Sequence, residues 1–436
     1  MEDINICCKL GELRSDSVPV ISGHESYFKR AAQFPVDLDT YLKLKDCVKA
    51  LGVTENFKEI VDYFKTPDGE TPAGFCASYE FKADGLLLVD LKRNINYGKN
   101  SEKRATGVLF SADCANPYEI KAFQSLMANI TTNPAIIYDT FINNEQANVG
   151  HLFHTREEVM TEIANVVGPG VDISVELNNP FASENQILEE VAQFEEILSP
   201  YRLVVKVPHL GPINQDNAPE LISGTFSKRY NDTKAADACY SHELACMLRD
   251  HGYRVNFTLM AEPHQTAMAL QVKPAFINTF MRNRYHHSEK IDELLKCYRA
   301  TEEPHYLAQL RDYFIKNYYL SPVDKDMGLL EVKREAEKLL AYRGWYSTDP
   351  DGLDQARHNL RLIANSNLTD TRLIICSLDT DMYAKVDKML MEPEFQGMTD
   401  RVVITASPKY LTDFTSSPAV LNYNRNFFKA ASTSKT

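Results

Sequence analysis

Short apolar segments alternate with amphipathic segments along the chain from about residue 106 onward. The apolar segments are rich in Val, Ile and Leu, which is typical of strands that are buried on both faces of a parallel sheet. Eight of them are predicted strands, at 107–112, 129–131, 171–175, 203–207, 254–260, 275–280, 372–377 and 401–406. Eight strands separated mostly by helices predict an α/β fold, a (β/α)8 TIM barrel, whose site lies at the carboxyl ends of the strands.

Two of the amphipathic segments carry a recognisable helix start. Thr155-x-x-Glu158 and Ser183-x-x-Gln186 match the capping box, in which the first and last side chains each accept a hydrogen bond from a backbone N–H group. We therefore predict helices that begin directly after Thr155 and directly after Ser183.

The first 105 residues are patterned less regularly, and we predict two domains, 1–105 and 106–436. Amphipathic patterns at 38–51 and 54–64 predict short helices, and 85–89 is strand-like. We predict that this N-terminal extension is mostly helical. None of its residues suggests a chemical role.

Two connections are longer than a barrel requires, 211–239 after the fourth strand and 286–367 after the sixth. Because loops that follow strands lie above the site, we interpret 211–239 as a lid or specificity loop. The segment 286–367 contains several amphipathic helical patterns, and we predict that it covers the barrel mouth or makes an oligomer contact.

A lysine interrupts the fourth predicted strand. Lys206 lies within Leu-Val-Val-Lys-Val-Pro, where burial of its charge would cost several kcal/mol unless the amine is paired or its pKa falls. A lysine amine that loses its proton is a nucleophile for carbonyl carbons, so Lys206 is a candidate Schiff-base residue. The alternative is a lysine that reaches solvent from the strand end or pairs with a carboxylate.

Other polar residues lie at the ends of the first five predicted strands. Each alone has an ordinary structural explanation, such as a helix cap or a turn. Asn256 and Thr258 are two residues apart, so on a strand their side chains point the same way. Because the strand ends of a barrel converge, we predict that these polar residues form one site with the lysine. The set is Asp113, Thr132, Asn133, Glu176, Lys206, Asn256 and Thr258.

Composition narrows the classes of partner. The net charge of −13 argues against nucleic acid, because phosphate backbones require a basic surface. No apolar stretch approaches the roughly 20 residues that a membrane helix needs. The first residues lack a signal-peptide pattern, and the 9 cysteines include no Cys-x-x-Cys pair, so we expect a reduced, cytoplasmic protein.

His151-x-x-His154 has the spacing of two metal ligands but lacks a third ligand, and we predict no metal site.

Five sequence motifs resemble the successive strand-end motifs of the transaldolase and fructose-6-phosphate aldolase family. The resemblance runs from about 107 to 414 and excludes the N-terminal extension. Its most specific parts are the Thr-Thr-Asn-Pro segment and the lysine strand. The motifs are Asp113-Cys-Ala-Asn-Pro-Tyr-Glu-Ile120, Thr131-Thr-Asn-Pro134, Ser174-Val-Glu176, Val204-Val-Lys-Val-Pro208 and Val255-Asn-Phe-Thr-Leu259.

The resemblance implies a cofactor-free transferase or class I aldolase that acts on a ketose. It implies that Lys206 forms the carbinolamine and Schiff base and that Asp113 transfers a proton at the cleaved C–C bond. Glu176 with Thr258 would position a catalytic water. The amide side chains of Asn133 and Asn256 would hold the lysine and the substrate hydroxyls, and Thr132 belongs to the same motif.

Departures from the family concern phosphate binding. Members that use sugar phosphates bind the phosphate with a serine and an arginine after strand six and an arginine after strand seven. In this chain Asn278 stands at the first serine position, and after Ser377 an aspartate, Asp379, stands where the second arginine is expected. A carboxylate repels phosphate, so we predict an altered substrate, such as a non-phosphorylated one.

An ordinary pentose-phosphate transaldolase is the alternative, with the phosphate held by Arg282 or Arg284, or with Arg372 in compensation. Phe280 follows the transaldolase pattern, which favours transfer over free cleavage. The expected partner is a small sugar or sugar phosphate, in a chain that can be a homo-oligomer.

His209 stands where the family has a small residue. It is either an acid–base or substrate-contacting group, or a solvent-facing loop histidine. A catalytically retired barrel that acts as a binding or scaffold protein is the non-enzyme alternative for the whole chain. Retention of the complete polar set argues against that alternative.

Overall fold

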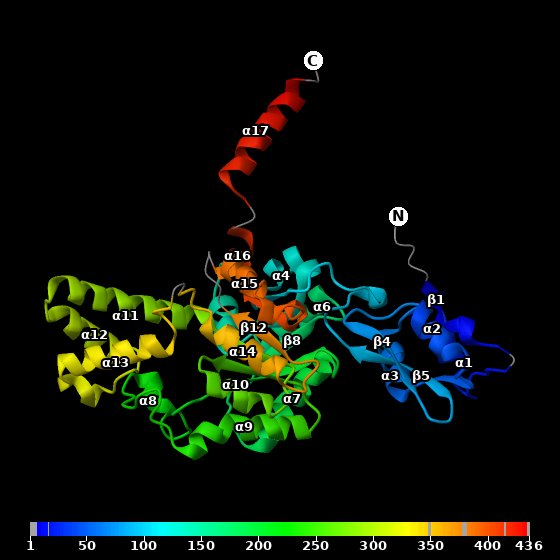
Figure 1. Ribbon diagram of the computed structural model, residues 1–436, viewed down its shortest axis with the longest axis horizontal. Coiled ribbons are helices and arrows are strands. Elements are labelled where there is room, and N and C mark those ends of the chain that lie inside the picture. Colours follow the sequence, from blue (N-terminus) through cyan, green and yellow to red (C-terminus); the bar gives the residue numbers. More distant parts are fainter. Residues whose placement is uncertain (1–6, 16, 348–349, 377–381, 414–415, 434–436) are drawn as a thin grey trace.

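The computed structural model describes residues 7–15, 17–347, 350–376, 382–413 and 416–433. Its central part is a closed barrel of eight parallel strands in sequence order, which confirms the predicted (β/α)8 architecture (Figure 1). Every predicted strand is present within a few residues of its predicted bounds. The strands are β6 (Leu109–Asp113), β7 (Met127–Thr131), β8 (Asp172–Glu176), β9 (Leu203–Pro208), β10 (Val255–Met260), β11 (Phe276–Phe280), β12 (Arg372–Cys376) and β13 (Val402–Ala406).

Helices surround the barrel and follow most of its strands. Both predicted capping boxes are present, at Thr155 with Glu158 and at Ser183 with Gln186. The surrounding helices are α4 (Pro117–Phe123), α5 (Pro134–Ile137), α6 (Arg156–Val167), α7 (Glu184–Leu198), α9 (Ala235–Asp250), α10 (Pro263–Leu270), α14 (Asp354–Ala364), α15 (Met382–Leu390) and α16 (Pro408–Asp413).

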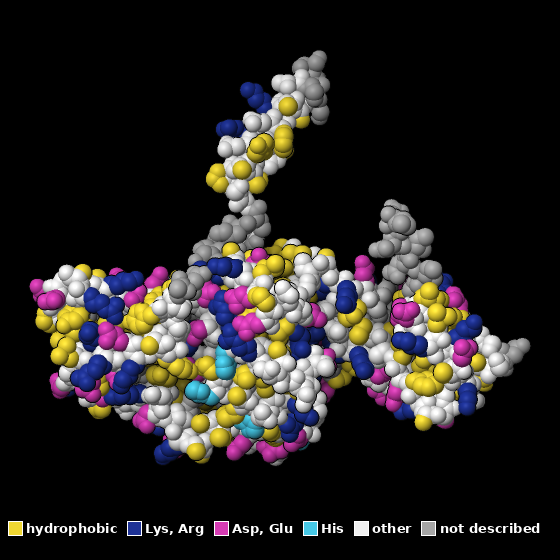
Figure 2. Space-filling model, viewed as in Figure 1, with side chains coloured by type: hydrophobic (Ala, Val, Ile, Leu, Met, Phe, Trp, Pro, Cys, Tyr) yellow, Lys and Arg dark blue, Asp and Glu magenta, His cyan; other side chains and the backbone are white. Residues whose placement is uncertain are grey.

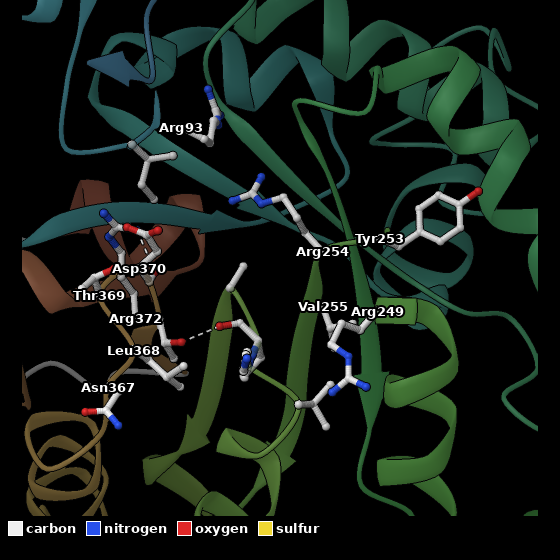
Figure 3. Close-up of a pocket in the computed structure, with 16 residues that line it drawn as sticks. Arg93, Arg249, Tyr253, Arg254, Val255, Asn367, Leu368, Thr369, Asp370 and Arg372 are labelled. Atoms are coloured by element: carbon white, nitrogen blue, oxygen red, sulfur yellow. Dashed lines mark hydrogen bonds between the residues drawn. The ribbon is translucent and has the colours of Figure 1, made fainter. Parts of the chain in front are cut away.

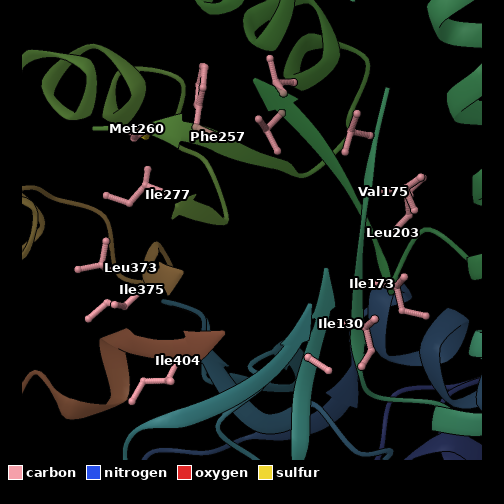
Figure 4. Close-up of a cluster of buried hydrophobic side chains, with 14 of the residues drawn as sticks. Ile130, Ile173, Val175, Leu203, Phe257, Met260, Ile277, Leu373, Ile375 and Ile404 are labelled. Carbon is pink, nitrogen blue, oxygen red and sulfur yellow. The ribbon is translucent and has the colours of Figure 1, made fainter. Parts of the chain in front are cut away.

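Alternate residues of each strand enter two different cores. Outward-facing side chains such as Ile173, Val175 and Ile375 pack against the helices (Figure 4). Inward-facing apolar side chains, including Leu109 and Val204, form a smaller cluster inside the barrel. Because side chains alternate along a strand, residues two and four positions further along these strands also face inward. Three of those four positions are polar, namely Ser111, Asp113 and Lys206, and the fourth is Pro208. The polar positions bring predicted site residues together.

The N-terminal extension contains strands as well as the predicted helices, so the prediction of a mostly helical segment is corrected. β3 (Ala50–Val53), β5 (Leu86–Arg93) and β4 (Phe75–Phe81) form a three-stranded sheet in that order. The sequence does not predict β4, because only Phe75 of that strand is buried and its pairing with β5 supplies its order. The other elements are β1 (Cys7–Lys9), β2 (Pro35–Asp37), α1 (Glu25–Ala31), α2 (Leu38–Lys45) and α3 (Glu55–Phe64).

The two enlarged connections contact each other. The second contributes α11 (Met281–Thr301), α12 (His305–Lys316) and α13 (Leu329–Tyr342), which share their own apolar core and lie on the side of the barrel opposite the extension (Figure 1). In the first connection, which contains α8 (Ala218–Ser223), Arg229 donates to both carboxylate oxygens of Asp324 at 2.9 and 2.8 Å. The first connection is therefore anchored to the second.

The last helix, α17 (Pro418–Thr433), projects away from the barrel (Figure 1). Hydrophobic side chains lie exposed along it in Figure 2, among them Leu421, Phe427 and Phe428. Among the described helices, none combines the length and the apolar character that a membrane span requires.

Candidate active site

Lys206 lies inside the barrel near the carboxyl end of β9. Its side chain is 5% exposed, and its Nζ lies 3.1 Å from the Glu176 carboxylate on the neighbouring strand β8. The amine also donates to the backbone carbonyl oxygen of Thr132 at 3.2 Å. The buried lysine is thus paired with a carboxylate near the carboxyl end of the barrel.

Asp113 ends β6 and belongs to the same group of charges. Burial raises the pKa of its carboxyl group, the charge of Lys206 lowers it, and that of Glu176 raises it, with a raised pKa as the net result. Lys206 and Glu176 therefore lie close enough to Asp113 to act on its titration. One amine thus has a carboxylate in contact and a second carboxyl group within electrostatic reach, and such groups can transfer protons.

A chain of buried hydrogen bonds supports the floor of this site. The Ser111 hydroxyl donates to Asn129 Oδ1 at 2.8 Å, and the Asn129 amide donates to Ser174 Oγ at 3.3 Å. The Asn256 amide donates to the same hydroxyl oxygen at 3.1 Å. Asn256 pairs in register with Lys206, so the network fixes a polar group directly beside the lysine.

Several inward-facing polar atoms near the lysine have no hydrogen-bond partner among the described residues. They are Asn256 Oδ1, Thr258 Oγ1 and Asn278 Nδ2, and all three residues are almost fully buried. Asn278 Oδ1 accepts a bond from the Cys376 thiol at 2.7 Å. Buried polar atoms are normally satisfied, so this set is suited to a ligand rich in hydroxyl groups.

The Thr-Thr-Asn-Pro segment has a larger structural role than expected. The Thr132 hydroxyl donates to the Ser174 carbonyl oxygen at 3.2 Å and so joins β7 to β8. Asn133 Oδ1 accepts from the Ile136 N–H group at 2.8 Å and caps α5. Thr132 contacts the lysine through its backbone, and the side-chain oxygen of Asn133 is occupied by the cap.

His209 is only partly exposed and its Nε2 is buried, so the prediction of a solvent-facing loop histidine is corrected. Residues 203, 205 and 207 of β9 face the helices, and the His209 ring follows them and stacks on Phe257, with ring centroids 5.3 Å apart. Burial, with a smaller contribution from His242, lowers the pKa of His209 to about 4. The ring is neutral at pH 7 and lies outside the barrel interior, so the structure gives it no place beside the lysine.

His209 should make the protein sensitive to mild acid. A histidine with a pKa near 6.5 when unfolded and about 4 when folded binds fewer protons in the folded state between these values. The free energy of unfolding should therefore fall as pH drops from 6.5 to 4, by up to about 1.4 kcal/mol per pH unit from this residue. Urea titrations of the wild type and His209→Phe should show a smaller pH dependence in the variant. Equal slopes would contradict this assignment.

The arginines proposed for phosphate binding lie in different settings. Arg284 is buried and its guanidinium pairs with Glu262 at 2.8 Å and Asp354 at 2.6 Å. Arg282 is exposed on α11. Arg372 begins β12 and therefore lies at the opposite end of the barrel from the lysine, so it cannot compensate for a missing phosphate ligand.

Phe280 ends β11 and packs against the apolar cluster inside the barrel, as expected for a residue that lines the mouth. Ser377 and Asp379 lie outside the described residues, so the predicted charge reversal after strand seven stays a prediction.

Sequence reasoning did not single out several residues that support the site. Ser111, Asn129 and Cys376 bond within the barrel interior, and burial raises the pKa of the Cys376 thiol, which stays protonated. Arg156 at the start of α6 donates to the Glu176 carbonyl oxygen at 3.2 Å and pairs with Glu190 on α7. The sequence did contain a signal for Ser111. It lies two residues before Asp113 on an apolar strand, so its side chain is expected on the same face of the strand as that of Asp113.

Fold and site together define an α/β barrel with a buried lysine that is paired with a carboxylate near the carboxyl end of the barrel. No protein-family model and no curated protein matches this chain.

Proposed function

We propose that this barrel is a transaldolase-like enzyme that transfers or cleaves a dihydroxyacetone-type unit of a ketose through an imine on Lys206. The observation that carries the proposal is the position of the Lys206 amine. It lies inside the carboxyl end of the barrel, 3.1 Å from Glu176 and within the electrostatic reach of Asp113. The resemblance to transaldolases supports the same assignment, as do the unpartnered polar atoms around the amine.

The chemistry follows from these groups. The neutral amine attacks the ketose carbonyl carbon, and the carbinolamine loses water to give a protonated imine. Ionised Asp113 removes the proton of the hydroxyl group beyond the bond to be cleaved. The C–C bond breaks, an aldehyde leaves, and the electron pair moves into the imine to form an enamine. In transfer, the enamine attacks a second aldehyde, whose oxygen takes the proton back from Asp113, and water then hydrolyses the new imine to release the product ketose and free Lys206. In cleavage, the enamine is protonated and its imine is hydrolysed in the same way.

Besides positioning the catalytic water, Glu176 transfers protons in this scheme. Its carboxylate accepts the proton that the Lys206 ammonium must lose before attack, and it returns a proton to the departing hydroxyl of the carbinolamine. The Thr258 hydroxyl and the side-chain Oδ1 of Asn256 have no hydrogen-bond partner among the described residues. Both are available to substrate hydroxyl groups or to the catalytic water.

A substrate without phosphate is favoured over the ordinary pentose-phosphate ketoses. Arg284 is already neutralised by Glu262 and Asp354, so a phosphate group near it would meet two carboxylates. The ordinary transaldolase assignment therefore depends on Arg282. Cytoplasmic carbohydrate metabolism is the setting that this chemistry implies, and the pentose phosphate pathway is the setting of the ordinary transaldolase assignment alone.

The test is to trap the imine. Protein incubated with dihydroxyacetone, fructose 6-phosphate or sedoheptulose 7-phosphate is reduced with borohydride, and the modified peptide is identified by mass spectrometry. We expect a stable adduct on Lys206 that is absent in Lys206→Arg, which keeps the positive charge beside Glu176. Stronger labelling by dihydroxyacetone than by the phosphorylated ketoses would support the unphosphorylated substrate. No adduct with any of the three, in folded protein, would remove the proposal.

A catalytically retired barrel is the second candidate, and the Lys206–Glu176 ion pair is the observation that favours it. A lysine held permanently as an ammonium would never attack a carbonyl group. The trapping experiment separates the two, because a retired barrel gives no adduct while it remains folded.

A further inference from the structure

A cavity of about 340 Å³ lies at the amino end of the barrel, away from Lys206 (Figure 3). Arg254 and Arg372 line it from the starts of β10 and β12, and Arg93 lines it from the end of β5 in the N-terminal extension. Arg249 and Lys273 complete its basic lining. We call this the basal cavity.

The charge of the basal cavity is opposite to that of the chain. Five basic side chains line it, whereas Asp370 is the one acidic residue among its described lining residues. The whole chain carries a net charge of −13, so this concentration of positive charge is not a property of the surface in general.

Neighbouring carboxylates balance only part of this charge. Arg93 and Arg254 share one buried carboxylate, that of Asp172. Arg249 pairs with exposed Asp250. Two arginines that share one carboxylate leave net positive charge beside the cavity.

Arg372 is buried and has no direct ion pair with a carboxylate among the described residues. It is 5% exposed, and its guanidinium donates to neutral acceptors, Asn94 Oδ1 at 2.8 Å and the Asp370 carbonyl oxygen at 3.0 Å. Its Nε is buried without a hydrogen-bond partner among the described residues. A buried guanidinium group with an unused donor is stabilised by an anion that accepts from it.

We propose that the basal cavity binds a phosphate group, carried either by inorganic phosphate or by a small phosphomonoester. A phosphate offers several acceptor oxygens to forked guanidinium donors, whereas a chloride ion offers no bidentate geometry. The cavity volume also accommodates a small organic group attached to the phosphate. The bound phosphate would contact Arg93 of the extension together with Arg254 and Arg372 of the barrel, so it would hold the two parts together.

This site is independent of the imine chemistry, and the experiment keeps them apart. Inorganic phosphate, glycerol 3-phosphate and AMP are titrated against KCl at equal ionic strength, with thermal unfolding and calorimetry as readouts. None of the three carries a ketone or aldehyde group, so none can form an imine with Lys206. We expect at least one to bind with a millimolar or lower dissociation constant and to raise the unfolding temperature.

Two variants and a control assign the binding to the basal cavity. Arg372→Met and the double variant Arg249→Ala/Lys273→Ala should each weaken binding at least about 10-fold, because each removes charge that faces the phosphate. Lys273 is exposed and Arg249 is half-exposed, so the double variant decides the matter if Arg372→Met does not fold. The control variant Lys121→Ala/Lys296→Ala also removes two positive charges, but from exposed positions outside the cavity lining. It should bind the phosphate compound as tightly as the wild type does.

The outcomes are distinct. Binding of inorganic phosphate alone identifies the free ion as the ligand, and preference for glycerol 3-phosphate or AMP identifies an organic phosphate. No response beyond that of KCl, or equal binding by the double variant and its control, overturns the proposal.

Discussion

Lys206→Met should lower the rate of ketose cleavage or transfer by a factor on the order of 10⁴ or more. The thioether cannot form the imine that withdraws electrons from the C–C bond, and no acid–base group replaces that function. The measurement is single-turnover release of the aldehyde, with the ketose that gives the strongest borohydride adduct. A loss of less than about 10-fold would place the nucleophile elsewhere.

Two matched variants separate the nucleophile from its surroundings. Lys206→Arg keeps a cation beside Glu176 and should be as inactive as Lys206→Met while it retains more stability, because Glu176 keeps a partner. Asp113→Asn should still form the borohydride adduct, yet release aldehyde more slowly by roughly 10²- to 10⁴-fold, as expected for loss of a general base. An Asp113→Asn protein that cleaves at the normal rate would assign the proton transfer to Glu176.

The largest effect on stability is expected at Asp172. This carboxylate is fully buried at the amino end of the barrel and pairs with Arg254 at 2.7 Å and with Arg93. Asp172→Asn keeps the shape of the side chain and leaves two largely buried guanidinium groups without a carboxylate. We expect the free energy of unfolding to fall by about 3–5 kcal/mol, measured by urea titration at pH 7.

Asp370→Asn is the matched control, because it makes the same change at an exposed position of the same cavity. It should cost less than about 1 kcal/mol. Burial alone would raise the pKa of Asp172, but Arg254 and Arg93 outweigh it and lower the pKa to about 2. The stabilisation is therefore complete above about pH 4 and is lost as pH falls toward 2. An Asp172→Asn protein as stable as Asp370→Asn would contradict the ion-pair account.

The barrel could be predicted from the sequence because its strands are buried on both faces. Such strands are continuous apolar runs, and each of the eight stands out from its polar flanks. The strand β4 of the extension could not be predicted in this way. It forms one edge of the three-stranded sheet and is mostly only half-buried, so pairing with β5 and not local hydrophobicity decides its structure.

The candidate site was predictable in part for a related reason. Lys206, Asn256 and Thr258 are polar residues at inward positions of apolar strands, and local alternation is enough to place them inside the barrel. Local alternation does not predict the ion pairs of Arg284, because its partners Glu262 and Asp354 lie 22 and 70 residues away in the sequence. It is also silent on the basal cavity, which joins Arg93 to residues near 254 and 372.

The sequence by itself determined the (β/α)8 fold and several of the polar residues that face its interior, because both follow from short-range alternation along single strands. Only the tertiary structure decided which charges are paired. In the structure Glu176 pairs with Lys206, and Glu262 pairs with Arg284. The His209 ring stacks on Phe257, and the Arg372 Nε–H group has no hydrogen-bond partner among the described residues. These outcomes depend on groups that meet across the barrel, and the free energy of each charge is set by those distant neighbours and by its burial.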